Sequence, residues 1–543
     1  MARVFWFRRD LRLQDNIALN AAIVGAKTDG DKKVCGLYVL EKPAFQELSG
    51  VRQWSLHASL DALGASMQRK LVIQQVETGK LSAAIVAAAK ASSAKFVHAT
   101  RSFDPAGIAE QNQVGLELQA AGIFLQLDDS YYAVAPGTVL KDDGTPYRVY
   151  TPFFNNWFKA GWASPVALIQ GFEWIEPIDC HGRPEPTKAS PFEVKAGEEF
   201  ALRTFERFKK RALLQYDELR NRADLSGTSH LSHALAFGEI HPRTILAQLG
   251  DSAGENVYRK EIAWREFYAD VLWNNPHTTD DYYEPRFKKM RYDSGLEADK
   301  KLLAWQQGKT GYPMVDAGMR QLLATGWMHN RVRMIVASFL IKDLHLEWQL
   351  GAKWFEENLS DFDPASNAHG WQWTAGCGTD ASPYYRIFNP IMQGYKFDPD
   401  GNYVRKFIPE LSHIQDKSVH EPWLLVDGLA NGYPAPIVDH AIEREESLAS
   451  NAHGWQWTAG CGTDASPYYR IFNPIMQGYK FDPDGNYVRK FIPELSHIQD
   501  KSVHEPWLLV DGLANGYPAP IVDHAIEREE SLARLEEIKV QKL

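Results

Sequence analysis

One segment of 84 residues occurs twice in succession, and this duplication limits how the chain can fold. Residues 366–449 and 450–533 agree letter for letter, and each copy opens with SNAHGWQWTAGCGTDASPYY. Solenoid proteins stack several diverged units of roughly 20–50 residues, whereas these two copies are longer and identical. The identity indicates a recent duplication or an error of assembly. Only one copy can complete a structure whose other parts occur once.

The first 130 residues alternate strand-like and helix-like segments. Apolar runs RVFWF, KVCGLYVL, LVIQQV, KFVHA and IFLQLD have the pattern of buried strands, and helical patterns such as NIALNAAIVGA lie between them. This alternation predicts an α/β domain over residues 1–130 with a doubly wound, five-stranded parallel sheet. Ligands of such sheets lie beyond the carboxyl ends of the strands. No GxGxxG follows any of the runs, which argues against a nicotinamide-binding domain.

The rest of the chain divides by composition and periodicity. Residues 131–195 are rich in Pro and Gly and are predicted to form an interdomain connector. Over residues 196–449 the apolar spacing is helical, as in NVYRKEIAWREFYADVLW, and predicts a large all-α domain. We expect residues 450–533 to be surplus and poorly packed, and residues 534–543 to form a C-terminal tail.

Charge and cysteine content narrow the classes of function. The net charge of −10 argues against indiscriminate nucleic-acid binding but allows a local basic patch. The four cysteines show no CxxC and no zinc-ligand spacing, so we expect no metal site and a reducing, cytoplasmic location. The N-terminus MARVFWFRRDLR does not have the pattern of a signal peptide. No apolar run approaches the roughly 18 residues that span a bilayer, so we expect no membrane partner.

One predicted helix places polar and aromatic residues on a single face. Glu261, Trp264, Arg265 and Tyr268 recur at positions i, i+3, i+4 and i+7. Such a face suits a ligand with a π-surface and polar edges, and the alternative is a buried structural ion pair. Similar mixtures of side chains occur in GWMHNRVRM and in DFDPASNAHGWQW. Together these motifs predict that the helical domain holds a large organic cofactor.

Charged side chains in these motifs could also pair with one another. Asp361 or Asp363 could pair with Arg333 or Arg265 inside the helical domain. The segment LSGTSHLSHAL adds hydroxyl groups around a predicted helix start, which can bind an anion, although plain N-capping is the simpler explanation. The segment QQGKTGYP matches only half of a phosphate-binding loop, because Leu303 stands where the pattern requires Gly.

Five segments resemble the photolyase/cryptochrome family. They are WFRRDLRLQDN, YDELRNRADLSGTSHLS, WREFY, GKTGYPMVDAGMRQL and GWQWTAGCGTDASPYYRIFNP. The resemblance extends over residues 1–449 and is greatest to bacterial-type class I cyclobutane pyrimidine dimer photolyases. Asn330 and Met334 stand where (6-4) photolyases have His, and Asn367 stands where plant-type cryptochromes have Asp.

The resemblance implies that the helical domain binds FAD in a U-shaped conformation. Residues expected around the diphosphate are Tyr216, Thr228, Ser229, Leu231 and Ser232. Those expected along the flavin and adenine are Glu261, Arg265, Trp327, Asn330, Arg333, Asp361, Asp363 and Asn367, with Asn367 facing flavin N5. Two positions depart from the family pattern, since His230 stands where Arg is common and Tyr258 where Trp is common. We expect altered contacts with FAD at both.

The implied substrate is a thymine dimer flipped out of UV-damaged duplex DNA. Trp264 and Trp373 would form an apolar wall, and Glu261 would hydrogen-bond the dimer. The pocket would be completed by Asn330 and Met334, and the DNA backbone contacted by Arg220, Arg331 and Gln393, with Lys396, Arg405 and Lys406 as possible additions.

The implied reaction is light-driven electron transfer from reduced FAD, which splits the cyclobutane ring as in a deoxyribodipyrimidine photo-lyase. Trp371, Trp348 and Trp305 match the electron-relay triad of the family, with core packing as the alternative role for each. A second antenna chromophore of folate or deazaflavin type is possible, but Asp104 and Pro105 keep only the outline of a folate-binding pattern. The protein is expected to be a monomer. A cryptochrome-like photoreceptor and an inactive flavin-binding protein are the alternatives.

The sequence context of the two copies favours the first. Copy one follows DFDPA and keeps Asp361 and Asp363 in register with Asn367, whereas copy two follows EREESLA. Use of copy two would require 84 residues to loop out, at a cost of about 4 kcal/mol. We therefore predict that residues 366–449 build the site.

Overall fold

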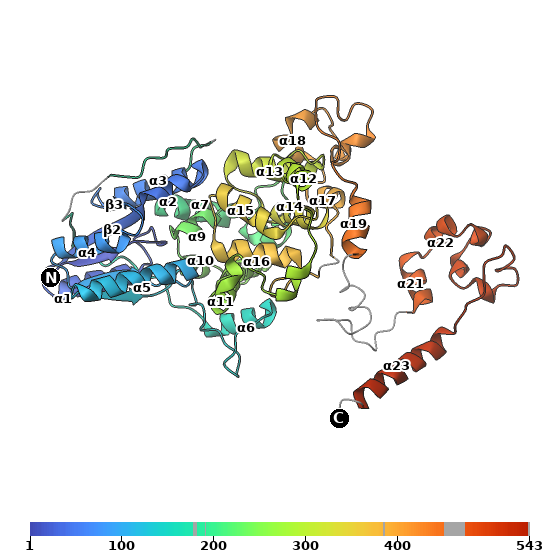
Figure 1. Ribbon diagram of the computed structural model, residues 1–543, viewed down its shortest axis with the longest axis horizontal. Helices are drawn as coiled ribbons and strands as arrows, with labels where there is room; N and C mark the ends of the chain where they lie inside the picture. Colours follow the sequence, from blue (N-terminus) through green and yellow to red (C-terminus); the bar gives the residue numbers. More distant parts are fainter. Residues whose placement is uncertain (177–181, 191, 384–385, 450–472, 541–543) are drawn as a thin grey trace. The chain divides into compact units, whose positions relative to one another are not determined.

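The computed structural model describes residues 1–176, 182–190, 192–383, 386–449 and 473–540. The chain divides into two compact units, Met1–Ser447 and Leu448–Leu543 (Figure 1). None of the helices in these described ranges combines the length and the apolar character needed to cross a membrane.

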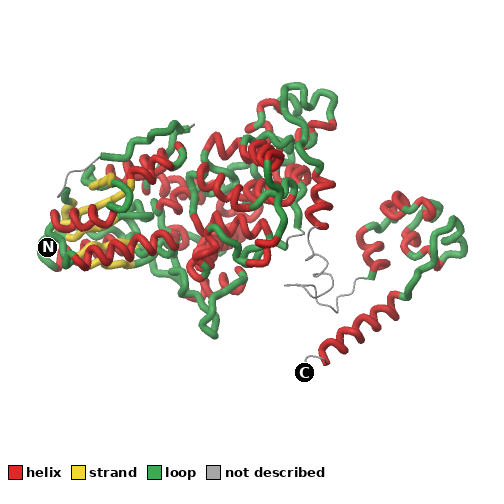
Figure 2. Tube along the Cα trace, in the orientation of Figure 1, coloured by secondary structure: helices red, strands yellow, loops and turns green. Residues whose placement is uncertain are grey.

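A parallel sheet forms the N-terminal part of the first unit (Figures 1 and 2). The strand order is β3 (Val72–Val76), β2 (Lys33–Glu41), β1 (Arg3–Trp6), β4 (Phe96–Thr100) and β5 (Phe124–Asp128). The five predicted strands are therefore confirmed. A sixth strand that the sequence did not indicate, β6 (Glu173–Trp174), pairs with the first two residues of β2, ahead of the part that pairs with β3.

Helices cover both faces of this sheet. Because side chains alternate along a strand, Phe5 of β1 packs with α1 (Ile17–Thr28) and α3 (Gly50–Ser66). Its neighbours Val4 and Trp6 face the opposite side, toward α4 (Leu81–Ala91) and α5 (Pro105–Ala120). A short helix, α2 (Lys42–Glu47), follows β2. Apolar side chains on both faces are typical of a doubly wound sheet, and they explain why the strands read as continuous apolar runs.

The predicted connector carries a helix of its own. Helix α6 (Tyr150–Ala160) buries Tyr150, Phe153 and Trp157 in a core shared with α7 (Glu198–Arg211) and α11 (Ala253–Asn274). The carboxylate of Glu266 on α11 accepts hydrogen bonds from the Ala133 backbone and the Trp157 indole. The Pro and Gly content of the surrounding sequence indicated a loop, so this amphipathic helix was not predicted. This part of the connector thus belongs to the packed helical core, whereas β6, later in the connector, pairs with the sheet.

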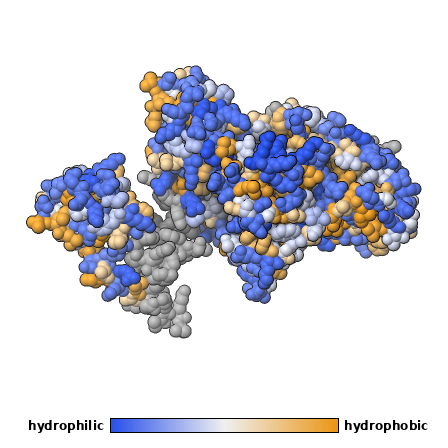
Figure 3. Space-filling view, turned by 180° about the vertical axis from the view of Figure 1, so that it is seen from behind, coloured by the Kyte–Doolittle hydropathy of each residue, from blue (hydrophilic) through white to orange (hydrophobic). Residues whose placement is uncertain are grey.

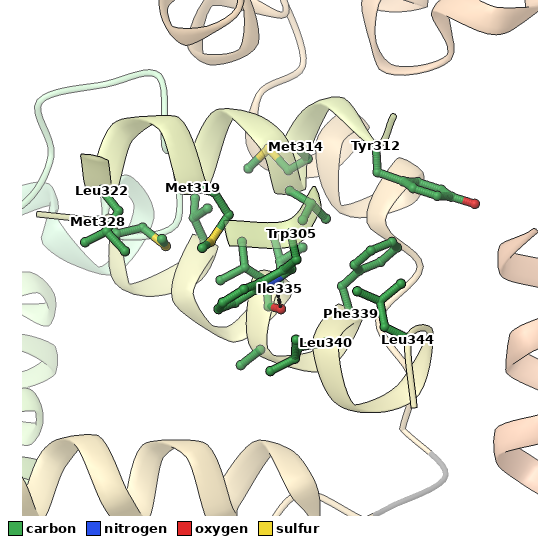
Figure 4. Close-up of a cluster of buried hydrophobic side chains, with 14 of the residues drawn as sticks. Trp305, Tyr312, Met314, Met319, Leu322, Met328, Ile335, Phe339, Leu340 and Leu344 are labelled. Carbon is green, nitrogen blue, oxygen red and sulfur yellow. Dashed lines mark hydrogen bonds between the residues drawn. The ribbon is translucent and has the colours of Figure 1, made fainter. Parts of the chain in front are cut away.

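Three further helices pack in that same core, namely α8 (Tyr216–Leu219), α9 (Ser232–Phe237) and α10 (Pro242–Leu246). A second core is formed by α12 (Leu296–Gln306), α13 (Pro313–Thr325), α14 (Asn330–Lys342), α15 (Trp348–Asn358), α16 (Pro364–Ala375), α17 (Pro390–Phe397) and α18 (Asn402–Phe407), and α19 (His440–Ala449) follows them along the chain. Figure 4 shows α13 and α14 packed around buried methionine and leucine side chains. Trp305 lies in the same cluster, and its indole N–H donates to the Val336 carbonyl at 3.0 Å. The predicted all-α region is confirmed.

Copy one of the duplicated segment packs against α13. Tyr403 on α18 is 2% exposed, and its hydroxyl donates to Gln321 at 2.8 Å. Arg320 forms an ion pair with Glu410 at 2.8 Å. The apolar side chains of copy one thus complete the core around α13 and α14.

The second unit contains the later part of copy two. It comprises α21 (Pro474–Phe481), α22 (Asn486–Phe491), three short 3-10 helices and α23 (His524–Val540), around a small core centred on Leu495, Ile498 and Val503. Phe481 and Tyr487 are 71% and 67% exposed, whereas the same residues of copy one are almost fully buried. Hydrophobic side chains are visible on the surface of this unit (Figure 3). The start of copy two, residues 450–472, lies outside the described residues.

Candidate functional site

The first unit contains a cavity of about 680 Å³ among α8, α9, α11, α14, α15 and α16. Most of the site residues predicted from the sequence line it, namely Tyr216, Arg220, Ser229, Ser232, Tyr258, Glu261, Trp264, Arg265, Asn330, Arg331, Arg333, Met334, Asp361, Asp363, Asn367, Trp371 and Trp373. Those that belong to the duplicated segment come from copy one. The described cavity wall thus includes residues of copy one, and that copy one alone builds the site stays a prediction.

Helix α11 presents the predicted face to the cavity. The helix begins at a capping box formed by Ser252 and Glu255, which fixes its register. Glu261, Trp264, Arg265 and Tyr268 all line the cavity, and Trp264 stacks on Tyr150 with ring centroids 3.7 Å apart and planes 7° apart. The connector helix therefore holds the indole that the resemblance assigns to the substrate wall.

Glu261 and Arg220 form an ion pair inside the cavity, with 2.7 Å between Nη1 and Oε1. Each side chain keeps about a quarter of its surface exposed. Burial raises the pKa of the Glu261 carboxyl above its usual value, and the charges of Arg220 and Arg331 oppose this shift. An ion pair, one of the two alternatives weighed from the sequence, is present here and faces the cavity, and the ligand-binding role of this face stays a prediction.

The two aspartates before α16 have different partners. Arg333 donates to Asp361 at 2.7 Å, which confirms that predicted pairing. The other oxygen of Asp361, Oδ1, is buried and has no hydrogen-bond partner among the described residues. Asp363 pairs with Arg9 at 2.6 Å, not with Arg333 or Arg265 as the sequence suggested. Arg9 lies in the segment WFRRDLRLQDN, which resembles the family. This resemblance was the only sequence feature that could have marked Arg9 as a residue of the site.

Helix α16 brings an amide and a glycine to the cavity wall. Pro364 occupies its first turn, and Asp363 caps the helix by accepting from the backbone N–H of Ser366 at 2.9 Å. Asn367 lines the cavity and donates to the Ala352 carbonyl at 3.0 Å. Gly370 lies one turn further, and an added Cβ there would meet no described atom within 4 Å.

The three predicted relay tryptophans occupy one core. Trp371 lines the cavity, and its ring centroid lies 6.1 Å from that of Trp305. Trp348 is in the same cluster and contacts Tyr282 edge-on at 6.0 Å. Trp305 and Trp348 are fully buried and are not among the described residues of the cavity wall. Their role as a relay stays a prediction.

Some other predicted residues do not line the cavity. The described wall does not include Thr228, His230, Leu231, Trp327 or Gln393. The Trp327 indole donates to the Ser232 hydroxyl at 3.2 Å, and the His230 ring lies 4.3 Å from Trp327. Trp327 therefore contacts the Ser232 side chain directly, and His230 contacts Trp327. The N-cap position of α9 is occupied by Leu231, which has no hydroxyl group. A side-chain hydroxyl therefore does not cap this helix at its N-cap position.

The cavity wall also contains residues that the sequence reasoning did not assign. They are Leu235, Ala236, Ile262, Ala337, Phe355, Leu359, Phe362, Ser366, Gly370, Thr374, Arg386 and Phe388. Helical spacing from Asn367 would have found Gly370 and Thr374, which follow it at i+3 and i+7. Arg386 and Phe388 lie in a loop, where no periodicity exists to reveal them.

The cavity is suited to a large organic ligand. In the ranges that the structure describes, no group of three or more His, Cys, Asp or Glu side chains is placed to hold a metal ion. Guanidinium groups of Arg265 and Arg333, hydroxyl groups of Ser229 and Ser232 and the unpaired oxygen of Asp361 provide donors and acceptors at separate points. Apolar and aromatic side chains line the cavity between these polar groups, as is usual for a cofactor site.

Known families match both halves of the chain. The DNA photolyase family matches residues 3–170. The FAD binding domain of DNA photolyase matches residues 258–450 and again residues 445–537. Curated relatives include the deoxyribodipyrimidine photo-lyase of Agrobacterium fabrum, 38% identical over 83% of this chain and 97% of the relative. The enzyme of Escherichia coli is 35% identical over 82% of this chain and 97% of the relative.

Solved structures show the same architecture. A bacterial class III photolyase from Agrobacterium tumefaciens is 37% identical, with a TM-score of 0.75 over 82% of this chain and 96% of that chain. A Synechocystis cryptochrome is 26% identical, with a TM-score of 0.74 over 83% and 99%. An archaeal photolyase from Sulfolobus tokodaii with two FAD molecules is 25% identical, with a TM-score of 0.72 over 83% and 99%.

Proposed function

The chain belongs to the photolyase/cryptochrome family, and from this premise we propose that it is a deoxyribodipyrimidine photo-lyase that splits cyclobutane pyrimidine dimers in UV-damaged DNA. The observation that carries the proposal is that one cavity holds both sets of residues. Arg333, Asp361 and Asn367 belong to the cofactor set, and Trp264 and Met334 to the dimer set. A cofactor and a flipped base could therefore meet in one enclosed space.

The residues of the cavity fit FAD. The unpaired, buried Oδ1 of Asp361 is an acceptor that a ligand N–H can satisfy, and an orphaned buried acceptor is otherwise costly. The hydroxyl groups of Ser229 and Ser232 can donate to a diphosphate, and Arg265 lies along the part of the wall that the resemblance assigns to the flavin and adenine. When bound, FAD supplies the light-driven electron transfer that splits the dimer.

The protein's own groups position the substrate. Tyr150 holds the Trp264 ring in a parallel stack, so the indole presents a fixed apolar surface. Glu261 faces the same space, where its carboxyl can hydrogen-bond the dimer, and burial and the charge of Arg220 shift its pKa in opposite directions. The ion pair with Arg220 orients the Glu261 carboxyl group in the cavity.

Finer assignments are part of the proposal. Class I rests on Asn330, Met334 and Asn367, and class III is the competing assignment because the similar structure from Agrobacterium tumefaciens is a class III photolyase. A second chromophore of folate or deazaflavin type stays a prediction, as does an additional flavin of the kind that the Sulfolobus tokodaii photolyase holds. That the protein is a monomer of the cytoplasm also stays a prediction from the sequence. We further propose that residues 450–533 are surplus.

A repair assay tests the function. Purified protein with reduced FAD is mixed with UV-irradiated oligothymidylate, and the loss of dimers is followed under blue light and in the dark. We expect loss only in the light. A cryptochrome-like photoreceptor, the second candidate because of the similar Synechocystis structure, would bind FAD and leave the dimers intact in the light.

Glu261→Gln is expected to lower the rate of repair roughly tenfold or more while FAD stays bound. The amide keeps the shape of the side chain but cannot act as a carboxyl group, and a hydrogen bond to a charged group contributes about 1.5–3 kcal/mol. The measurement is the initial rate of dimer loss per bound FAD. Unchanged repair would remove Glu261 from the substrate pocket. Glu297→Gln, at an exposed position of α12 and outside the cavity wall, is the control.

A further inference from the structure

Arg9 belongs to the α/β part of the first unit and contacts Asp363, a residue of the cavity wall. It lies between β1 and α1, and its Nη2 is 2.6 Å from Oδ2 of Asp363. Its Nη1 is 3.8 Å from Oδ2 of Asp104, the N-cap of α5. One guanidinium therefore stands between a carboxylate at the carboxyl end of the sheet and a carboxylate of the cavity wall.

The backbone around Arg9 is fixed by its contact with the end of α9. Gly238 follows this helix with φ +67°, and a Cβ there would lie 2.0 Å from the carbonyl oxygen of Arg9. Only glycine permits this approach. The Leu11 backbone N–H donates to the Phe237 carbonyl at 3.1 Å, and Nε of Arg9 donates to the Ala236 carbonyl at 3.4 Å. Arg9 is thus held at both its backbone and its side chain.

Asp363 connects Arg9 to helix α16. One carboxylate oxygen accepts from the Ser366 backbone N–H at 2.9 Å, while the other accepts from Arg9. The backbone carbonyl of Asp363 accepts from the N–H of Asn367 at 2.9 Å. The position of this one residue therefore sets the start of the helix that carries Asn367, Gly370 and Trp371 into the cavity wall.

The charges around Asp363 make Arg9 its main stabilising partner. Burial by itself would raise the pKa of Asp363, but Arg9 and, to a smaller extent, Arg265 lower this pKa to about 2. Arg265 is committed elsewhere, because it donates to the carbonyls of Tyr131 and Leu235 at 3.3 Å. Other titratable groups also face the Arg9–Asp363 pair, namely Asp104 at the start of α5, the hydroxyls of Tyr131 and Tyr132 from the connector, His369 on α16 and Arg52 on α3.

We propose that Arg9 is a positioning residue of the FAD site: by holding Asp363 it fixes the start of α16, and with it Asn367, against the bound cofactor. The α/β domain thereby contributes to the cofactor site without contacting the cofactor. The identity of the cofactor rests on the proposed function, whereas the linkage from Arg9 to α16 rests on the hydrogen bonds above.

Acid titration of Arg9→Gln tests the proposal, with Arg8→Gln as the matched control. Arg8 is the adjacent residue and has an ion pair of its own, to Glu110 at 2.8 Å, and its side chain hydrogen-bonds residues of α5 and not Asp363. FAD release is followed by flavin fluorescence as the pH falls. A lowered carboxyl pKa contributes stability that is present above about pH 3.9 and is lost as the pH falls through the folded value.

Without Arg9 this loss occurs at a higher pH. We expect the midpoint of FAD release in Arg9→Gln to rise by about one pH unit or more, with partial rescue in Arg9→Lys and no change in Arg8→Gln. An equal shift in Arg8→Gln and Arg9→Gln would overturn the proposal. The same titration of the FAD-free protein, followed by tryptophan fluorescence, gives a readout that does not depend on the identity of the cofactor.

A double-mutant cycle with Asp363→Asn separates positioning from general packing. In the Asp363→Asn background we expect Arg9→Gln to change FAD affinity less than twofold, because its partner is already neutral. An undiminished effect in that background would show that Arg9 acts elsewhere and would overturn the proposal. FAD binding is measured without DNA or light, so a failed repair assay with intact release shifts would count against the proposed activity alone.

Discussion

Gly370→Trp is expected to abolish FAD binding, whereas Gly454→Trp, the same change in copy two, is expected to leave binding intact. Gly370 lies on α16 in the cavity wall, and a Cβ there meets no described atom within 4 Å. The new indole therefore enters the cavity without straining the backbone and occupies space that the cofactor needs. We expect FAD affinity to fall at least about 100-fold, or about 2.8 kcal/mol.

Point variants are required because the two copies are identical. Removing residues 366–449 and removing residues 450–533 leave the same amino-acid sequence, so a deletion cannot identify the working copy. The shortened chain is expected to bind FAD and repair dimers, because every described residue of the cavity wall is retained. Gly370→Trp and Gly454→Trp keep both copies and alter only one of them.

FAD affinity is measured by fluorescence titration of the refolded or FAD-depleted protein, with circular dichroism as the check on folding. Loss of binding in Gly454→Trp alone would show that copy two builds the site. Loss only in the double variant would show that either copy can complete the cavity. Both outcomes contradict the prediction, which follows from the aspartates that precede copy one and are absent before copy two.

Much of the fold could be predicted because it depends on local periodicity. The strands of the sheet are continuous apolar runs, and burial on both faces makes them so. Strand β6 could not be predicted, because a strand of two residues is too short to show a repeating pattern of apolar and polar side chains. Helix α6 was missed because Pro and Gly dominate the composition around it, although Tyr150, Phe153 and Trp157 share one buried face.

The site was predictable where its residues share one helix. The face of α11 follows from the spacing of Glu261, Trp264 and Arg265 alone. The pairing of Arg9 with Asp363 did not follow, because these residues are 354 positions apart and meet only through the contact of the β1–α1 loop with α9. The stack of Tyr150 on Trp264 likewise depends on how the connector packs.

Tyr403→Ala is expected to destabilise the first unit by about 3–5 kcal/mol, as other large-to-small changes of buried aromatic residues do. Tyr403 is 2% exposed, packs in the core around α13 and donates its hydroxyl to Gln321 at 2.8 Å. Truncation would leave a cavity and remove this hydrogen bond. Total stabilities of domains are about 5–15 kcal/mol, so the loss is a large fraction of the whole.

Tyr487→Ala is the matched control, since Tyr487 occupies the same place in the identical segment NYVRKF of copy two. It is 67% exposed, so we expect a change within about 0.5 kcal/mol. Urea unfolding is followed by the release of FAD, which reports only the unit that holds the cofactor. Tyr403→Phe isolates the hydroxyl and should cost about 1 kcal/mol. Equal losses in Tyr403→Ala and Tyr487→Ala would mean that copy two is buried as deeply as copy one, because identical sequences differ in energy only through what they contact.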